Sequence, residues 1–218
     1  MSDRNPVLLI HGILIKSAVF RKMAVYLTQL GWTVHTLDLA PHYGNACLIE
    51  LAQQVATYVE KTFPPEQAID LVGLSMGGLV SRYYVQRLGG MNRVQRLITI
   101  SSPHNGTWMA YALWGQGCVQ MRPGSAFLAD LNQDAAVLAQ INFTSIWTPW
   151  DFIIVPATSS QLPVGKEVKL WIFAHAWMAR HAQSLATVAE ALAAPVKPRP
   201  QLGQSHCDQK LLPVESNI

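Results

Sequence analysis

Short apolar runs alternate with longer stretches of helical period along most of this chain of 218 residues. Six runs are rich in aliphatic and β-branched residues and are bounded by turn residues, so we expect them to be strands. They cover residues 7–10, 33–39, 69–74, 97–100, 144–147 and 168–173. Strands that alternate with helices predict an α/β domain around a mostly parallel sheet. Their near-continuous apolar character predicts that helices cover both faces of the sheet.

The stretches between these runs predict crossover helices over residues 17–30, 48–63 and 76–88, and a further helix over residues 181–192. Glycine or proline follows each of the first three, as is usual at a helix end. In the first helix, Phe20, Ala24 and Leu27 form the apolar stripe. We therefore expect one compact domain over residues 1–194, with about six strands and no large cap domain. Four prolines fall within residues 195–218, which predicts a loosely held tail.

Composition and charge narrow the classes of partner. Half of the residues are hydrophobic and 13% are charged, and 16 basic residues stand against 13 acidic ones. This balance leaves no basic surplus for a phosphate backbone, so we expect no nucleic acid partner. The longest apolar runs are far shorter than the roughly 20 residues of a spanning helix, so we expect no membrane span.

Cysteine usage and the first residues of the chain indicate a compartment. Cys47, Cys118 and Cys207 form no CxxC pair, which predicts neither a disulfide framework nor a metal site. The chain passes from polar residues at its start directly into the first apolar run, without the features of a signal peptide. We therefore expect a cytoplasmic protein that needs no cofactor or metal. The sequence does not specify its oligomeric state.

A possible nucleophile lies at the end of the third predicted strand. The run over residues 69–74 leads into Gly73-Leu74-Ser75-Met76-Gly77, and a helical pattern follows at once. This is the GxSxG elbow in the strand-turn-helix context that it requires. A Cβ two positions to either side of the serine would collide with the crossing strand and helix. The pattern predicts Ser75 as a nucleophile, held at the carboxyl edge of the sheet.

Donors for an oxyanion are expected on the two loops beside this serine. One is the N–H of the residue after the nucleophile, Met76, and the other comes from the loop after an early strand. His11-Gly12 opens that loop, so we expect the second donor to be the Ile13 N–H, with the neighbouring Leu14 as the alternative. We interpret His11 as a buried residue that bonds the backbone and shapes the loop.

A serine nucleophile needs a base, and the base needs an acid that orients it. In proteins that carry this elbow, the acid follows the serine in the chain and the histidine follows the acid. Of the acidic residues after Ser75, only Asp151 follows the carboxyl end of a predicted strand. His175 also follows a strand, whereas His181 lies where the last helix begins. We therefore predict Asp151 as the acid and His175 as the base, with His181 as the alternative base.

Taken in their order along the chain, these motifs resemble those of a known superfamily. His11-Gly12, the elbow, Ser101-Ser102-Pro103-His104-Asn105-Gly106, Trp150-Asp151 and Ala174-His175 together resemble the α/β-hydrolase superfamily, and within it the small bacterial triacylglycerol lipases. The resemblance covers residues 6 to 193. It implies the α/β-hydrolase fold and carboxylic ester hydrolysis through an acyl-enzyme. It implies Ser75, Asp151 and His175 as catalytic triad, with the Ile13 and Met76 amides as oxyanion hole.

Large apolar residues predict the kind of substrate. Trp108 and Trp114 stand in a short segment that is rich in such residues, and Leu14 and Phe20 lie near the oxyanion loop. These four are predicted to bind an apolar acyl chain, while packing of the segment 108–114 onto the core is the alternative. We expect a small-molecule acyl ester as the substrate, which an enzyme of this kind can meet at a lipid interface. An acyl-thioesterase and a non-catalytic binder of a small apolar ligand are the alternative functions.

Overall fold

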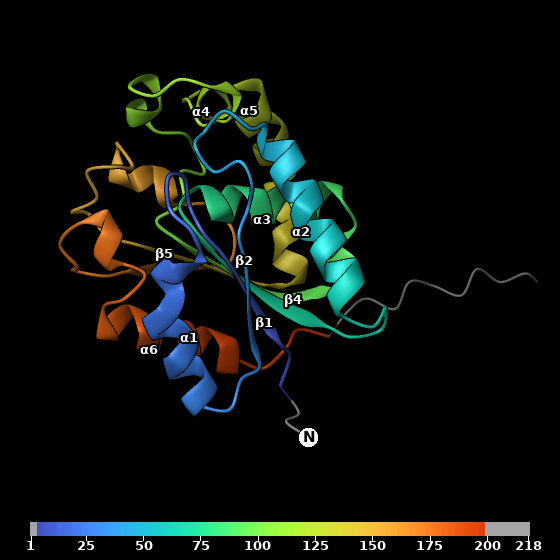
Figure 1. Ribbon diagram of the computed structural model, residues 1–218. Helices are drawn as coiled ribbons and strands as arrows, with labels where there is room; N and C mark the ends of the chain where they lie inside the picture. Colours follow the sequence, from blue (N-terminus) through green and yellow to red (C-terminus); the bar gives the residue numbers. More distant parts are fainter. Residues whose placement is uncertain (1–3, 199–218) are drawn as a thin grey trace, which may run out of the picture.

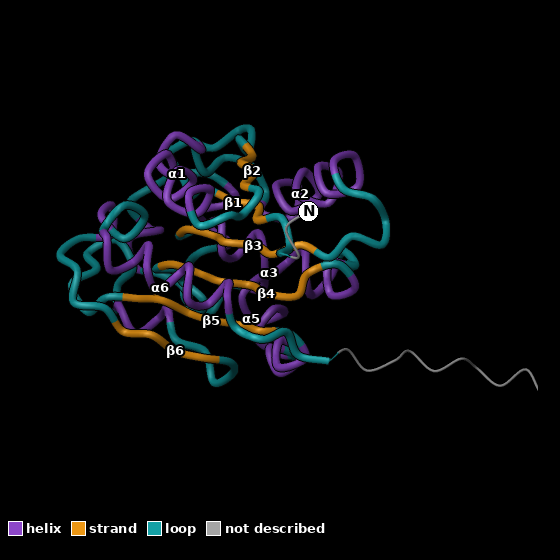
Figure 2. Tube along the Cα trace, turned by 90° about the horizontal axis from the view of Figure 1, so that it is seen from below, coloured by secondary structure: helices purple, strands orange, loops and turns teal. Residues whose placement is uncertain are grey.

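The structure is a computed structural model that describes residues 4–198. Its centre is a sheet of six parallel strands in the order β2-β1-β3-β4-β5-β6. The strands are β1 (Val7–Ile10), β2 (Val34–Leu37), β3 (Ile69–Leu74), β4 (Val94–Ile100), β5 (Asn142–Trp147) and β6 (Lys166–Lys169). Figure 2 shows them side by side in this order. The predicted α/β-hydrolase sheet is confirmed.

Helices cover the two faces of the sheet in separate groups (Figure 1). One face carries α1 (Arg21–Gln29) and α6 (Ala182–Ala193), and the other carries α2 (Leu48–Thr62), α3 (Met76–Arg87), α4 (Gln116–Gln120) and α5 (Ala126–Gln133). Alternate residues of the central strands enter two hydrophobic cores. Leu9 and Val72 pack toward α1 and α6, whereas Leu8, Leu71 and Leu97 pack toward α2 and α3. This burial on both faces is the reason that the central strands read as continuous apolar runs.

Neither edge strand is covered on both faces, contrary to the prediction that helices cover both faces of the sheet. β2 is only partly buried, and three of the four residues of β6 are exposed. The run expected as a strand over 168–173 begins earlier and ends at Lys169. Beyond it Leu170 and Ile172 are buried while Trp171 and Phe173 are exposed. An edge strand has a neighbour on one side only, so an apolar run does not show that both of its faces are covered.

The first helix also departs in detail from its predicted pattern. It opens as a 3-10 turn over Ser17–Phe20 and continues as α1. Phe20 and Leu27 are buried as expected, and Ala24 packs against the same core while partly exposed, but Met23 is also on this stripe and is fully buried. Met23 and Ala24 lie three and four residues after Phe20, and both of these positions share its face in an α-helix.

The chain after α6 is fastened to the sheet over its first residues. The amide of Asn142 donates to the Pro195 carbonyl at 2.9 Å, and the Lys197 N–H donates to the Asn142 side-chain oxygen at 3.1 Å. Residues 195–198 of the predicted tail thus lie against the start of β5. The rest of that tail is outside the described residues, so its loose order stays a prediction.

Candidate active site

Ser75 occupies the turn between β3 and α3. Its backbone angles are φ 55° and ψ −123°, a combination that residues other than glycine rarely adopt. Bonds on both sides hold the turn: the Ser75 N–H donates to the Ile100 carbonyl at 2.8 Å, and the Gly78 N–H donates to the Ser75 carbonyl at 3.0 Å. The geometry is that of the elbow expected from the motif, at the carboxyl edge of the sheet.

The glycines of the motif leave room for this turn. A Cβ on Gly73 would lie 2.6 Å from the Gly77 carbonyl oxygen, and a Cβ on Gly77 would overlap the carbonyl oxygen of Ile10 at the end of β1. Backbone cannot move away from such a contact as a flexible side chain can. Both positions therefore require glycine because α3 starts directly against β3 and β1.

Asp151 and His175 form a hydrogen-bonded pair at the same edge. Asp151 Oδ2 accepts from His175 Nδ1 at 2.7 Å, and Asp151 Oδ1 accepts from the N–H groups of Ile153 and Ile154, each at 2.9 Å. Burial alone would raise the pKa of Asp151. The hydrogen bond from His175 and the two backbone donors outweigh burial, so that the pKa lies below its ordinary value. The carboxylate is thus ionised and able to orient the ring of His175.

The ring of His181 has another role. Its Nδ1 accepts from the Gln183 N–H at 3.3 Å, which caps the start of α6. The two candidate bases are therefore distinguished by their partners. A carboxylate orients His175, whereas His181 bonds the backbone of its own helix.

Two backbone donors lie on the loops beside Ser75. Met76 is the first residue of α3, so its N–H has no partner within the helix. Within residues 4–198, no hydrogen bond is made by the N–H of either Met76 or Ile13. The Leu14 N–H, the alternative donor, is engaged by the His42 carbonyl at 2.8 Å. A Cβ on Gly12 would lie 3.0 Å from the Ser75 Cβ, so the loop that carries Ile13 lies against Ser75.

His11 holds this loop in place through hydrogen bonds to the backbone, as the sequence predicts. It is fully buried, its Nε2 accepts from the Leu39 N–H at 2.9 Å, and its Nδ1 donates to the Gly12 carbonyl at 2.8 Å. Burial lowers the pKa of His11, which favours the neutral ring that these two bonds require. His11 therefore ties the end of β1 to the end of β2.

The four predicted substrate-binding residues separate into two groups. Leu14, Trp108 and Trp114 are exposed, and Trp114 has 90% of its surface accessible, so the segment 108–114 does not simply pack onto the core. Phe20 is fully buried in the core beneath α1 and α6. The prediction that Phe20 binds substrate is wrong, because the 3-10 turn before α1 directs its ring into that core.

Two buried features near the site carried no clear signal in the sequence. Arg82 of α3 is fully buried and donates to the Leu131 carbonyl at 2.8 Å and to His104 Nδ1 at 3.3 Å. Burial lowers the pKa of Arg82 to about 9. Ser101 has φ 46° although it is not glycine, and within residues 4–198 its buried hydroxyl has no partner. Both depend on which chain segments pack together, and motif spacing alone does not specify that packing.

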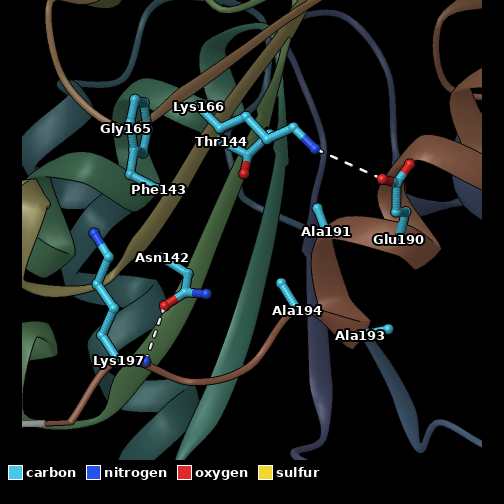
Figure 3. A pocket seen from close by; sticks show the side chains of 10 residues that line it. All are labelled: Asn142, Phe143, Thr144, Gly165, Lys166, Glu190, Ala191, Ala193, Ala194 and Lys197. Carbon is cyan, nitrogen blue, oxygen red and sulfur yellow. Dashed lines mark hydrogen bonds and ion pairs between the residues drawn. The ribbon is translucent and has the colours of Figure 1, made fainter.

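The opposite edge of the sheet holds a hollow of about 720 Å³ (Figure 3). It lies between the starts of β5 and β6 and the end of α6. Lys166 and Glu190 face each other across it with 3.6 Å between the nitrogen and oxygen. Ser75 and His175 are not among its lining residues. In the described part of the chain, no group of three His, Cys, Asp or Glu side chains is placed to hold a metal ion, and no helix is long and apolar enough to span a membrane.

The chain also matches the model of a known protein family. The family model of palmitoyl protein thioesterase matches residues 6–141, well over half of the chain. The chain belongs to this family. The match includes Ile13, Ser75 and Met76 and ends before Asp151 and His175.

The chain also matches part of two curated relatives. It is similar to the lysosomal thioesterases PPT2 of Homo sapiens and Mus musculus, at 33% and 32% identity over 110 residues. Each match covers 48% of this chain and 35% of the relative, so the chain spans about a third of the relatives' length.

In structure it is similar to Aspergillus fumigatus lipase B, with TM-score 0.77 at 18% identity over 89% of this chain and 54% of that one. Bacillus licheniformis lipase BlEst2 in its mature form gives TM-score 0.72 at 13% identity over 88% and 93%. These likenesses are in fold, and they agree with the resemblance to small bacterial lipases.

Proposed function

We propose that this chain is an acyl hydrolase that cleaves fatty acyl thioesters, and carboxylic esters of the same acyl chains, through an acyl-enzyme on Ser75. The observation that carries the proposal is the 2.7 Å bond between Asp151 Oδ2 and His175 Nδ1, at the sheet edge where the elbow holds Ser75. Membership of the palmitoyl protein thioesterase family supports the choice of thioesters as the first substrates to test. The lipase fold of its structural neighbours supports the ester activity.

The proposed mechanism assigns a role to each polar group of the site. With its Nδ1–H donated to Asp151, His175 keeps the lone pair of Nε2 for the Ser75 proton. Ser75 Oγ attacks the acyl carbonyl carbon, and the Ile13 and Met76 N–H groups stabilise the resulting oxyanion. When the oxyanion collapses, the C–S or C–O bond to the leaving group breaks, His175 gives its proton to the departing sulfur or oxygen, and the acyl group stays on Ser75. A water molecule, activated by the same histidine, then releases the carboxylic acid.

Activity-based labelling tests the nucleophile. A fluorophosphonate probe should label the natural chain, and Ser75→Ala should abolish the label and lower turnover by at least about 10³-fold. Ser125→Ala is the matched control and should keep full labelling, because the Ser125 hydroxyl caps α5 and bonds the Gln120 carbonyl. A label that persists in Ser75→Ala would show that another residue is acylated.

A matched pair of substrates tests the bond that is cleaved. An octanoyl thioester and the octanoyl ester of the corresponding alcohol share the acyl chain and differ in one atom. We expect kcat/KM to favour the thioester. A ratio in favour of the ester would assign the chain to the esterases. Binding of octanoate without labelling or turnover of either substrate would identify a non-catalytic binder.

A further inference from the structure

Exposed apolar side chains are concentrated at the edge of the sheet that holds Ser75. They stand on the loops that follow β1, β2, β4, β5 and β6, and each of them exposes more than half of its surface. They are Leu14, Tyr43, Trp108, Trp114, Phe152 and Trp177, which we call the apolar rim. The carboxyl ends of parallel strands meet at one edge, so these five loops belong to one end of the molecule.

Contacts between neighbouring loops show that the loops carrying the rim lie side by side. The loop after β1 bonds the loop after β2 through Leu14 and His42, and the Cys118 N–H donates to the carbonyl of Gly44. The Trp108 N–H donates to the Val155 carbonyl, which joins the loops after β4 and β5. The Phe152 and Phe173 rings lie 5.9 Å apart, which joins the loops after β5 and β6. A patch of this extent around one end of a protein marks a surface that meets another apolar phase.

Cations lie at the same end, in what we call the basic groove. Lys22 and Arg180 line two adjoining hollows. Trp177 completes the hollow of about 510 Å³, and Arg21 completes the hollow of about 320 Å³. No carboxylate lines either hollow. Among the described residues, no carboxylate oxygen lies within 4.0 Å of these three cations. The groove follows His175 closely in the chain, since Trp177 ends the turn that His175 begins.

Aromatic rings beside unpaired cations fit one kind of partner. Trp and Tyr favour the boundary between lipid headgroups and acyl chains, and Lys and Arg are attracted to anionic headgroups. We propose that the apolar rim and the basic groove together form a docking surface for an anionic lipid bilayer. The rim would enter the headgroup region, and Arg21, Lys22 and Arg180 would contact the lipid phosphates. Docking of this kind concerns binding alone and does not depend on the proposed hydrolysis.

Vesicle co-sedimentation tests the proposal without turnover if ether analogues of the two phospholipids are used, because these contain no carboxylic ester to cleave. The natural chain should bind vesicles of phosphatidylcholine with 30% phosphatidylserine headgroups better than pure phosphatidylcholine vesicles, by about tenfold or more. The difference should shrink as salt is raised. Lys22→Gln with Arg180→Gln should remove this preference while leaving hydrolysis of a soluble acetyl ester unchanged. Trp108→Ala with Trp114→Ala should weaken binding to both kinds of vesicle by at least about tenfold.

Control variants use residues away from this surface. Lys61→Gln with Lys197→Gln removes two cations from the opposite edge of the sheet, and Leu30→Ala with Val196→Ala shortens two exposed apolar side chains outside the rim and the groove. Both pairs should bind vesicles as the natural chain does. Equal binding to neutral and anionic vesicles would overturn the role of the basic groove. Sedimentation as a dimer that binds no vesicles would instead assign the rim to a second copy of this chain.

Discussion

The segment from Ala174 to His181 shows how single residues decide the candidate base. Ala174 has φ 75° and ψ 138°, a conformation that costs energy in a residue with a Cβ. The turn that follows brings His175 back onto Asp151. His181, at the end of the same segment, faces the first turn of α6 instead. Two histidines six residues apart thus have different partners because the backbone between them turns.

The base is tested by replacing each histidine in turn. His175→Ala should lower turnover about as much as Ser75→Ala, because the serine then has no proton acceptor. His181→Ala should keep most activity and cost about 1 kcal/mol in the free energy of unfolding through the lost helix cap. Turnover by each variant and its urea unfolding check both statements. Loss of activity in His181→Ala alone would move the base to that residue.

At the scale of secondary structure, the contact of α3 with β1 and β3 positions Ser75. The first turn of α3 lies against the carbonyl oxygens at the end of β1, with glycine at each close approach. Arg82 then fastens the same helix to α5 through the Leu131 carbonyl. The elbow is therefore held by the strand below it and by a buried side chain farther along the helix.

Two glycine substitutions separate close packing from backbone conformation. Gly77→Ala should destabilise the fold by about 3 kcal/mol and lower activity, because its Cβ must displace the backbone of β1. Gly89→Ala serves as the control. Gly89 has φ 79° and open space around it, so alanine there should cost only about 1 kcal/mol and leave activity intact. Denaturant unfolding and ester turnover measure the two effects. Similar losses for both variants would contradict the packing argument.

For the whole molecule, a buried ion pair ties the sheet to the end of the last helix. Arg96 Nη1 donates to Asp70 Oδ2 at 3.0 Å, and Arg96 also donates to the Ala194 carbonyl at 2.7 Å. Asp70 is fully buried, and burial raises its pKa to about 6 despite bonds from Asn5 and Arg96. A raised carboxyl pKa makes the folded state bind a proton more tightly than the unfolded state. This residue's contribution to stability therefore declines as the pH rises from about 4 to about 6.

Removal of Arg96 should make this pH dependence larger. Arg96→Leu leaves the Asp70 carboxylate buried without its cation, which should cost about 3–5 kcal/mol at pH 8. At pH 5 the cost should be smaller, because Asp70 is then largely protonated in the folded variant. Urea unfolding at the two pH values measures the difference, and Asp70→Asn combined with Arg96→Leu should remove most of it. An equal cost at both pH values would mean that Asp70 does not titrate in this range.

The sequence by itself determined the parts that depend on local order. The elbow around Ser75 follows from five consecutive residues between a strand and a helix. Asp151 and His175 could be selected because each follows an apolar run, and parallel strands bring such positions to one edge. The six-stranded sheet and the supporting position of His11 were predicted in the same way. The cytoplasmic location stays a prediction.

Tertiary structure decided which apolar side chains are buried. The sequence gives Phe20 and Trp108 similar character, yet Phe20 lies in the core and Trp108 is exposed on the rim. It equally predicts a long last strand, whereas β6 ends at Lys169 and leaves Trp171 exposed. Burial depends on whether another element covers a side chain. That is set by the packing of segments far apart in the chain, and periodicity within one segment does not report it.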